Sequence, residues 1–242
     1  LVVATLDWPP YIGTNQCQGG WLAHYMSAVL LTAGYNPEFR FLPWARAVRM
    51  VELGHADILA PEYEIEPSAP SDIATGDKRL DHLAMSLPFS HTPLHYFSAA
   101  SSQINQAPTL AQLPNFSVGV VRGYQNAPDI DKVLDSGKVV VQQAIDDAQN
   151  LDLLMNNRVN VIIGDPAVIH TIAARKGISE QRYKVLEPRI IEQSLYFALA
   201  KSRPQWQSLQ ADINKAITML NLHGVDKQIM AQLSEQCQNY TH

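Results

Sequence analysis

Two tryptophans, Trp8 and Trp44, are the first residues whose type and position could do chemistry. Trp8 lies in a Pro-Pro loop directly after the first predicted strand, and Trp44 follows Pro43 at the start of a predicted helix. Either ring taken alone could be a core anchor. Two aromatic rings at the carboxyl ends of neighbouring strands are better explained as walls of one cleft, where they offer faces for stacking or cation–π contact.

Two charged residues, Arg79 and Asp165, are further candidates for recognition. Arg79 follows a long loop, and the alternative for it is a solvated charge or a salt bridge with Asp77 or Asp81. Asp165 follows an apolar strand and precedes Pro166, so it is also expected to cap the next helix. A cap and a ligand contact are compatible roles for one carboxylate.

The sequence lacks the short motifs of common catalytic and nucleotide-binding sites. It has no G-x-x-x-x-G-K, G-x-G-x-x-G, H-E-x-x-H, C-x-x-C or G-x-S-x-G. His91 and His95 are four residues apart but straddle Pro93, and no third metal ligand can be named. No serine or cysteine has an obvious base and orienting group. We therefore expect no catalytic residue, metal or cofactor.

Short apolar runs alternate with helical patterns in the first part of the chain. Trp44, Ala47, Val48 and Val51 share one helical face, and the outward face is expected to hold Arg46, Arg49 and Glu52. This β-loop-α-β-α-β order is typical of an α/β sheet with helices on its faces. The predicted strands are 1–5, 38–42 and 57–60, and the predicted helices are 22–33 and 43–53.

A long polar loop over 61–78 separates this part from a second α/β series, and loops of that length tend to be functional or mobile. The second series consists of strands 117–121, 138–141 and 160–163 and helices 145–156 and 167–175. Apolar strands 95–99 and 195–199 flank it, and two helices, 205–220 and 225–236, end the chain.

This connectivity predicts two α/β lobes joined by two strands. Lobe 1 is expected to contain residues 1–93 and 198–242, and lobe 2 residues 94–197. A ligand is expected in the cleft between the lobes, outside the carboxyl ends of the strands.

Composition excludes several classes of protein. The chain has 242 residues, of which 46% are hydrophobic and 17% charged, so its bulk is not disordered. The net charge of −5 and the lack of a basic stripe argue against nucleic-acid binding. The longest apolar run, 26–33, is far shorter than the roughly 20 residues of a membrane span.

The two cysteines, Cys17 and Cys237, lie near opposite ends of the sequence. They are either buried thiols or one disulfide of an exported protein, tying an N-terminal loop to the C-terminal tail. Both fall in the predicted lobe 1, so a disulfide would not lock a hinge. Residues 1–5 have the pattern of a strand, so we expect that any export signal has been removed or never existed.

Taken together, these segments resemble the extracellular solute-binding protein family 3, which includes the polar amino-acid binding proteins of ABC transporters. The resemblance covers essentially the whole chain and implies the two-lobed, type II periplasmic-binding fold. It is carried by the order and spacing of short motifs: Asp7-Trp8-Pro9-Pro10-Tyr11, Pro43-Trp44-Ala45-Arg46-Ala47, Gly54-His55-Ala56-Asp57, Asp77-Lys78-Arg79, Met85-Ser86-Leu87-Pro88, Val118-Gly119-Val120-Val121-Arg122-Gly123, Gly164-Asp165-Pro166 and Gly224-Val225-Asp226-Lys227.

The resemblance also implies roles for individual residues. Arg79, six residues before Met85-Ser86, matches the arginine that grips the ligand α-carboxylate with its bidentate fork. Asp165 matches the aspartate that accepts hydrogen bonds from the ligand ammonium. The implied ligand-binding set, with aromatic rings around the side chain and the loop after Val121 near the carboxylate, is Trp8, Tyr11, Trp44, Glu62, Arg79, Arg122, Gln125 and Asp165.

Three departures from the family pattern affect specificity. Glu62 lies where relatives often have serine or threonine, and a glutamate there would repel a ligand carboxylate but attract a cationic group. About a dozen residues are inserted before Asp77, which shifts the local alignment around Arg79. Tyr124 and Gln125 replace the usual small hydroxyl residues.

The resemblance implies a monomeric periplasmic, or otherwise exported, protein that captures a small polar solute, an amino acid or a small carboxylate, for the membrane permease of an ABC transporter. A sensing module or stand-alone receptor of the same fold is the first alternative. An enzyme of dehydratase or lytic type is the second, and Glu62 is the only acid–base candidate for it.

Overall fold

The computed structural model describes residues 1–237 and divides into two compact units. Unit 1 comprises Leu1–Ser90 and Leu195–His242, and unit 2 comprises His91–Ser194. Two strands carry residues of both units: β5 (Ser90–Ala99) and β9 (Tyr183–Ala200). The chain therefore passes from one unit to the other twice, each time within a strand.

Unit 1 contains a mixed sheet whose strands run in the order β2-β1-β3-β9, with β4 on β9. β1 is parallel to β2 and β3, and β9 is antiparallel to β3 and β4. The strands are β1 (Val2–Thr5), β2 (Glu38–Phe41), β3 (Ile58–Glu62) and β4 (Leu83–Met85). The helices are α1 (Trp21–Thr32), α2 (Trp44–Glu52), α3 (Arg79–His82), α7 (Trp206–Leu222) and α8 (Val225–Gln236).

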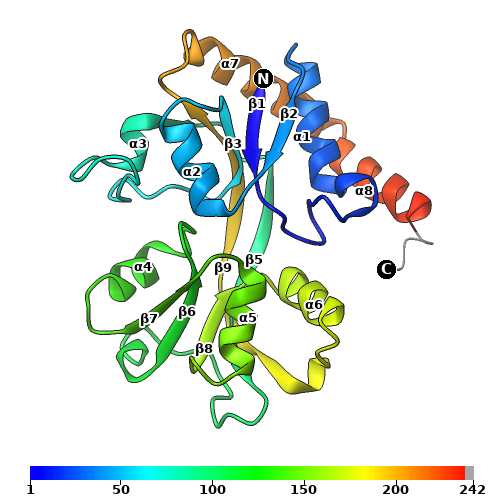
Figure 1. Cartoon of the computed structure of the whole chain (residues 1–242). Coiled ribbons are helices and arrows are strands. Elements are labelled where there is room, and N and C mark those ends of the chain that lie inside the picture. The colour runs from blue at the N-terminus through cyan, green and yellow to red at the C-terminus, as the bar shows by residue number, and fades with distance from the viewer. Residues whose placement is uncertain (238–242) are drawn as a thin grey trace. The chain divides into compact units, whose positions relative to one another are not determined.

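The predicted face of α2 is the buried one. Trp44, Ala47, Val48 and Val51 are buried while Arg46 and Arg49 are exposed, and the helix packs on β1 and β3. The outward position predicted for Glu52 is wrong: its side chain is buried and accepts a hydrogen bond from the Asp72 backbone N–H. The helices α1, α7 and α8 pack on one another (Figure 1). Burial of these apolar faces stabilises the helices, since isolated helices of this length are only marginally stable in water.

Unit 2 contains a sheet of order β5-β8-β6-β7, in which β6 is parallel to β7 and β8 while β5 is antiparallel to β8. Val118 and Val120 face a core cluster that includes Ile130, whereas Gly119 faces Asn150 on the opposite side. The strands are β6 (Ser117–Val121), β7 (Val140–Ala144) and β8 (Val161–Gly164), and the helices are α4 (Pro128–Leu134), α5 (Asp147–Met155) and α6 (Pro166–Arg175).

Some elements differ from the sequence prediction. α4 was not predicted, although Pro128 at its start and Asp129 and Asp131 in its first turn are ordinary helix-start residues. The predicted strand 195–199 is the end of the much longer β9. Both differences lie in segments where the apolar periodicity is short or interrupted by proline.

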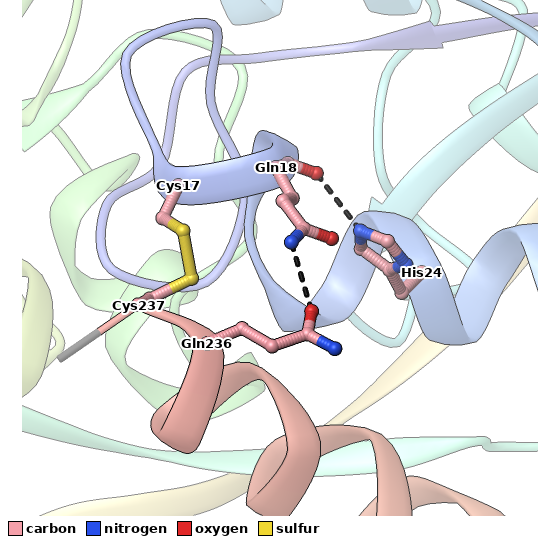
Figure 2. Close-up of a disulfide and its surroundings, with 5 residues drawn as sticks. All are labelled: Cys17, Gln18, His24, Gln236 and Cys237. Atoms are coloured by element: carbon pink, nitrogen blue, oxygen red, sulfur yellow. Dashed lines mark hydrogen bonds between the residues drawn. A yellow bond between two sulfur atoms is a disulfide. The ribbon is translucent and has the colours of Figure 1, made fainter. Parts of the chain in front are cut away.

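A disulfide joins Cys17 to Cys237, which lie 220 residues apart in the sequence and both belong to unit 1. Beside it, Gln18 Nε2 donates to Gln236 Oε1 at 2.8 Å, and the His24 ring lies 2.9 Å from the Gln18 carbonyl oxygen (Figure 2). The disulfide and the Gln18–Gln236 bond attach the short 3-10 turn Cys17–Gly19 to the end of α8, and the His24 bond attaches it to α1. The structure thus contains the disulfide rather than two buried thiols.

Candidate functional site

In unit 1, three aromatic rings meet at the carboxyl ends of β1 and β3. The ring of Trp8 lies 4.7 Å from that of Tyr11 and 6.0 Å, edge to face, from that of Tyr63. A tight turn places the first two together, since the backbone N–H groups of Tyr11 and Ile12 both donate to the Trp8 carbonyl. Trp8 is 4% exposed, so the neighbouring side chains cover most of it.

Trp44 is also 4% exposed and lies in the first turn of α2, on the buried face of that helix. Tyr63, which follows Glu62 at the end of β3, was not among the predicted site residues. Its position directly after a strand was the sequence signal that could have identified it, as for Trp8.

The side chains of Glu62 and Arg79 lie side by side and are almost completely buried. Glu62 Oε1 is 3.8 Å from Arg79 Nη1, and Asp72 Oδ2 is 3.7 Å from Arg79 Nη2. Arg79 therefore faces two carboxylates of its own chain. Arg79 is 3% exposed, so it is not the solvated charge that the alternative predicted, and its backbone N–H donates to the Ala69 carbonyl.

Burial raises the pKa of Glu62 to about 8, with Arg79 opposing the increase and Glu52 adding to it. Its second oxygen, Oε2, is buried and has no hydrogen-bond partner among the described residues. Within unit 1, Glu62 is thus a buried carboxyl group that gains or loses its proton slightly above neutral pH.

The long loop that precedes Arg79 is attached to α2. Glu52 Oε2 accepts a hydrogen bond from the Asp72 backbone N–H at 3.0 Å, and Arg49 Nη1 donates to the Asp72 carbonyl at 2.7 Å. Burial also raises the pKa of Glu52. Three carboxyl groups, Glu52, Glu62 and Asp72, therefore lie around the Arg79 guanidinium.

In unit 2, Asp165 caps α6. Its Oδ1 accepts a hydrogen bond from the Val168 backbone N–H at 3.1 Å, and the side chain is buried at the carboxyl end of β8. The predicted cap is therefore present. A carboxylate has about four lone-pair sites, so the cap leaves acceptor capacity for another donor.

A second buried carboxyl group, Asp147, lies near Asp165. It follows β7 at the start of α5, and Tyr124 donates its hydroxyl to Asp147 Oδ2 at 2.8 Å. Burial raises the pKa of Asp147 to about 7; the Tyr124 bond opposes this, and the charges of Asp146 and Asp165 add to it. The predicted binding set contained neither Asp147 nor Tyr124, and the available signal was the Asp146-Asp147 pair at the start of the predicted helix 145–156.

The loop after β6 contains the remaining predicted residues. Arg122 is exposed and its backbone N–H bonds to the Ala144 carbonyl at 2.9 Å, while Gln125 is half-buried. Asn126 fixes the end of the loop by donating to Asp131, and its carbonyl accepts from Gln193.

Unit 1 thus brings together part of the predicted set, since Trp8 meets Tyr11 and Glu62 meets Arg79. In unit 2, Asp165 interacts with Asp147, which was not in the predicted set. No group of three or more His, Cys, Asp or Glu side chains within residues 1–237 could hold a metal ion.

Over the same described residues, no helix combines the length and apolar character needed to cross a membrane.

Comparison with known proteins gives structural matches only, since no family model and no curated protein matches the chain. A histidine kinase sensor domain with similarity to periplasmic binding proteins is 19% identical, with a TM-score of 0.75 over 96% of this chain and 94% of that one. An ancestral arginine-binding protein bound to arginine is 18% identical, with a TM-score of 0.74 over 96% of both chains. The substrate-binding protein of an amino acid ABC transporter is 17% identical, with a TM-score of 0.71 over 97% of both. The chain therefore has the α/β fold of the type II periplasmic binding proteins, as its sequence indicated.

Proposed function

We propose that the protein binds a small polar solute, an amino acid. The observation that carries the proposal is the pair of buried carboxyl groups, Asp147 and Asp165, at the carboxyl ends of strands in unit 2. Ligands of open α/β sheets bind at this edge, and a buried carboxylate there is a natural acceptor for an ammonium group. The arginine-bound and amino acid transporter neighbours support the same class of ligand.

The side chains of unit 1 favour a ligand with a second cationic or polar group. Trp8, Tyr11 and Tyr63 offer ring faces and edges, and cations bind well to such faces. Glu62, which directly precedes Tyr63 in the sequence, adds a buried carboxyl group. Arg79 is proposed to bind the ligand carboxylate; to do so it must exchange its contact with Glu62 or Asp72 for the ligand.

A thermal-shift panel of the L-amino acids tests this proposal. A ligand at a hundredfold excess over its Kd stabilises the folded protein by about 2.7 kcal/mol, which should raise the Tm by several degrees. Arginine and lysine are expected to give the largest shifts, and N-acetylated forms, which lack the ammonium group, none. A shift with a sugar or a metal ion but with no amino acid would overturn the proposal.

Asp165→Asn is the sharpest variant, because asparagine caps helices about as well as aspartate. The fold should survive while the affinity for the amino acid falls by at least tenfold, since a charge-assisted hydrogen bond is lost. Asp146→Asn is the matched control: Asp146 caps α5 through Gln149 in the same way but is exposed. Equal loss in both variants would show that capping, not ligand contact, is the role of Asp165.

A sensing role is a second candidate, because one of the structural neighbours is a histidine kinase sensor domain. We propose the transport role first, with an ABC permease as partner and a periplasmic or otherwise exported location, which the disulfide favours. Uptake of radiolabelled ligand by cells with and without the gene separates the two roles, since a sensor would change transcription and leave uptake unaltered.

We propose no enzymatic activity. Incubating the protein with its ligand and measuring the ligand by mass spectrometry tests this. A product that disappears in a Glu62→Gln variant would restore the enzyme hypothesis.

A further inference from the structure

Unit 2 contains a pocket of about 520 Å³ whose lining includes neither Asp147 nor Asp165. Its walls are the loop 107–110, the start of α4 and residues 188–191 of β9. All lining residues belong to unit 2, so the pocket is complete within one unit. Its volume lies within the range of small-molecule sites in proteins, roughly 300–1,000 Å³.

Exposed apolar side chains come to this pocket from all three walls. Leu110 of the loop is 41% exposed and Ile191 of β9 is 37% exposed. Pro128 of α4 and Pro188 of β9 belong to the same lining and are also exposed. A bound molecule can therefore reach all four side chains. Apolar groups that are exposed together, rather than singly, are typical of a binding surface, because covering them removes apolar area from water.

Hydrogen bonds hold two of the walls in place. The Ala107 backbone N–H donates to the Glu187 carbonyl at 2.8 Å, which joins the loop to β9. Within the loop, the Thr109 backbone N–H donates to Gln112 Oε1 at 2.9 Å. The pocket is therefore preformed, and a ligand does not have to order these walls when it binds.

Two charged residues, Asp129 and Arg189, belong to the lining, and they differ in their partners. Arg189 Nη1 pairs with Glu192 Oε2 at 3.2 Å. Asp129 is exposed, and among residues 1–237 no side-chain hydrogen bond or ion pair involves it. Of the two charges, the Asp129 carboxylate is therefore the one that is open to a ligand.

An exposed carboxylate beside an apolar hollow discriminates between charged ligands. It attracts an ammonium group and repels another carboxylate. Glu187, which precedes Pro188 in the sequence and is 74% exposed, adds negative charge at the β9 wall. Because Asp129 is exposed, its attraction is modest and is screened by salt.

We propose that this pocket binds an organic ammonium ion with an apolar ring or chain. The hydrocarbon part lies against Leu110, Ile191 and the exposed prolines, and the ammonium group pairs with Asp129. The site is distinct from the proposed amino acid site, and its occupation does not depend on that proposal.

Phenethylamine, an aromatic ring with an ammonium group, is the probe. Phenethyl alcohol is its uncharged counterpart, and hydrocinnamate is the corresponding anion. Calorimetry with the whole protein should give the highest affinity for the amine and the lowest for the anion. Added salt should weaken binding of the amine and leave that of the alcohol unaltered, since salt screens exposed charges.

Methyl NMR of protein labelled at leucine and isoleucine locates the bound probe. The signals of Leu110 and Ile191 should shift on addition of phenethylamine, which distinguishes this pocket from a site at Asp147 and Asp165. Shifts confined to residues outside the lining would overturn the proposal.

Asp129→Asn should weaken phenethylamine binding by roughly 2- to 5-fold, the effect of one exposed ion pair, and leave binding of the alcohol unaltered. Asp135→Asn, an exposed change at the C-terminal end of α4 and outside the lining, is the matched control and should bind both probes as the wild type does. Equal affinity for the amine in the wild type and Asp129→Asn would contradict the assigned role of Asp129.

Ala107→Phe is designed to fill the pocket and should abolish binding of the amine and the alcohol. Ala111→Phe, four residues along and exposed outside the lining, is the matched control and should bind both normally. Failure of phenethylamine to bind the wild-type protein would overturn the proposal. If Ala107→Phe does not fold, the methyl shifts and the Asp129→Asn comparison decide the matter.

Discussion

Glu62 Oε1 lies 3.8 Å from Arg79 Nη1, and both side chains are shielded from water. Glu62 comes from the end of β3 and Arg79 from the start of α3, on the two sides of the long polar loop. Their contact therefore joins the start and the end of that loop, with Asp72 beside Arg79 and Glu52 bonded to the Asp72 backbone. Removing Arg79 would leave these carboxyl groups without their cation and is expected to destabilise the protein.

The stability of the protein is expected to fall as the pH rises from about 5 to 8. The pKa of Glu62 is raised to about 8 by burial, above its ordinary value near 4.5. Between these two values the folded state binds more protons than the unfolded state, so raising the pH favours unfolding. Urea titrations at several pH values should show this slope, at most roughly 1.4 kcal/mol per pH unit from Glu62.

Glu62→Gln should reduce that slope, because glutamine does not titrate. Glu64→Gln, an exposed change two residues away, is the control and should leave the slope as it is in the wild type. An unchanged slope in Glu62→Gln would show that Glu62 is ionised throughout this range.

The second prediction concerns the hydrogen bond from Tyr124 to Asp147. The bond stabilises the ionised carboxylate, so Tyr124→Phe should raise the pKa of Asp147 above its value of about 7. Carbon-13 NMR of labelled aspartate, titrated from pH 5 to 9, measures this directly. Tyr35→Phe, which removes an exposed hydroxyl in unit 1, is the control. A lower pKa in Tyr124→Phe would contradict the assigned direction.

The third prediction concerns the disulfide. Cys17 and Cys237 enclose nearly the whole chain, so the bond restricts the unfolded state strongly, with an expected contribution of about 2–5 kcal/mol. The double variant Cys17→Ser/Cys237→Ser should lower the urea midpoint accordingly. The wild type treated with a reducing agent should match the double variant, and an unshifted midpoint in both would argue against the bond in solution.

The parts of this structure that are local in sequence could be predicted from it. The spacing of Trp44, Ala47, Val48 and Val51 gave the buried face of α2. The order of strand, Asp165 and Pro166 predicted the cap of α6, which depends only on neighbouring residues. The predicted carboxyl ends of the strands likewise indicated where polar side chains lie close together.

Contacts that depend on strand register or on the path of a loop could not be predicted from the sequence alone. Tyr124 meets Asp147 because β6 pairs in parallel with β7, with Val121 opposite Ala144, so that the loops after both strands start side by side. Glu62 meets Arg79 because the loop between them folds back over α2. In both cases the partner lies more than fifteen residues away, and no periodicity links the two.

The fourth prediction concerns Gly119, in the middle of β6. A Cβ atom there would lie 2.9 Å from Ile162 Cγ2 and even closer to the side-chain oxygen of Asn150. Asn150 is fully buried and donates to the carbonyls of Gly119 and Ile163, so it has little freedom to move. Gly119→Ala should therefore destabilise the protein by roughly 1–3 kcal/mol, the usual effect of overpacking.

Urea denaturation of Gly119→Ala measures this effect. Gln143→Ala, an exposed change on the neighbouring β7, is the control and should stay within about 0.5 kcal/mol of the wild type. Because Asn150 belongs to α5, the helix that begins with Asp147, displacement of Asn150 should also disturb the carboxyl groups of the proposed site. Weaker amino acid binding is thus expected alongside lower stability, and a stable variant with normal binding would show that β6 and α5 can separate without cost.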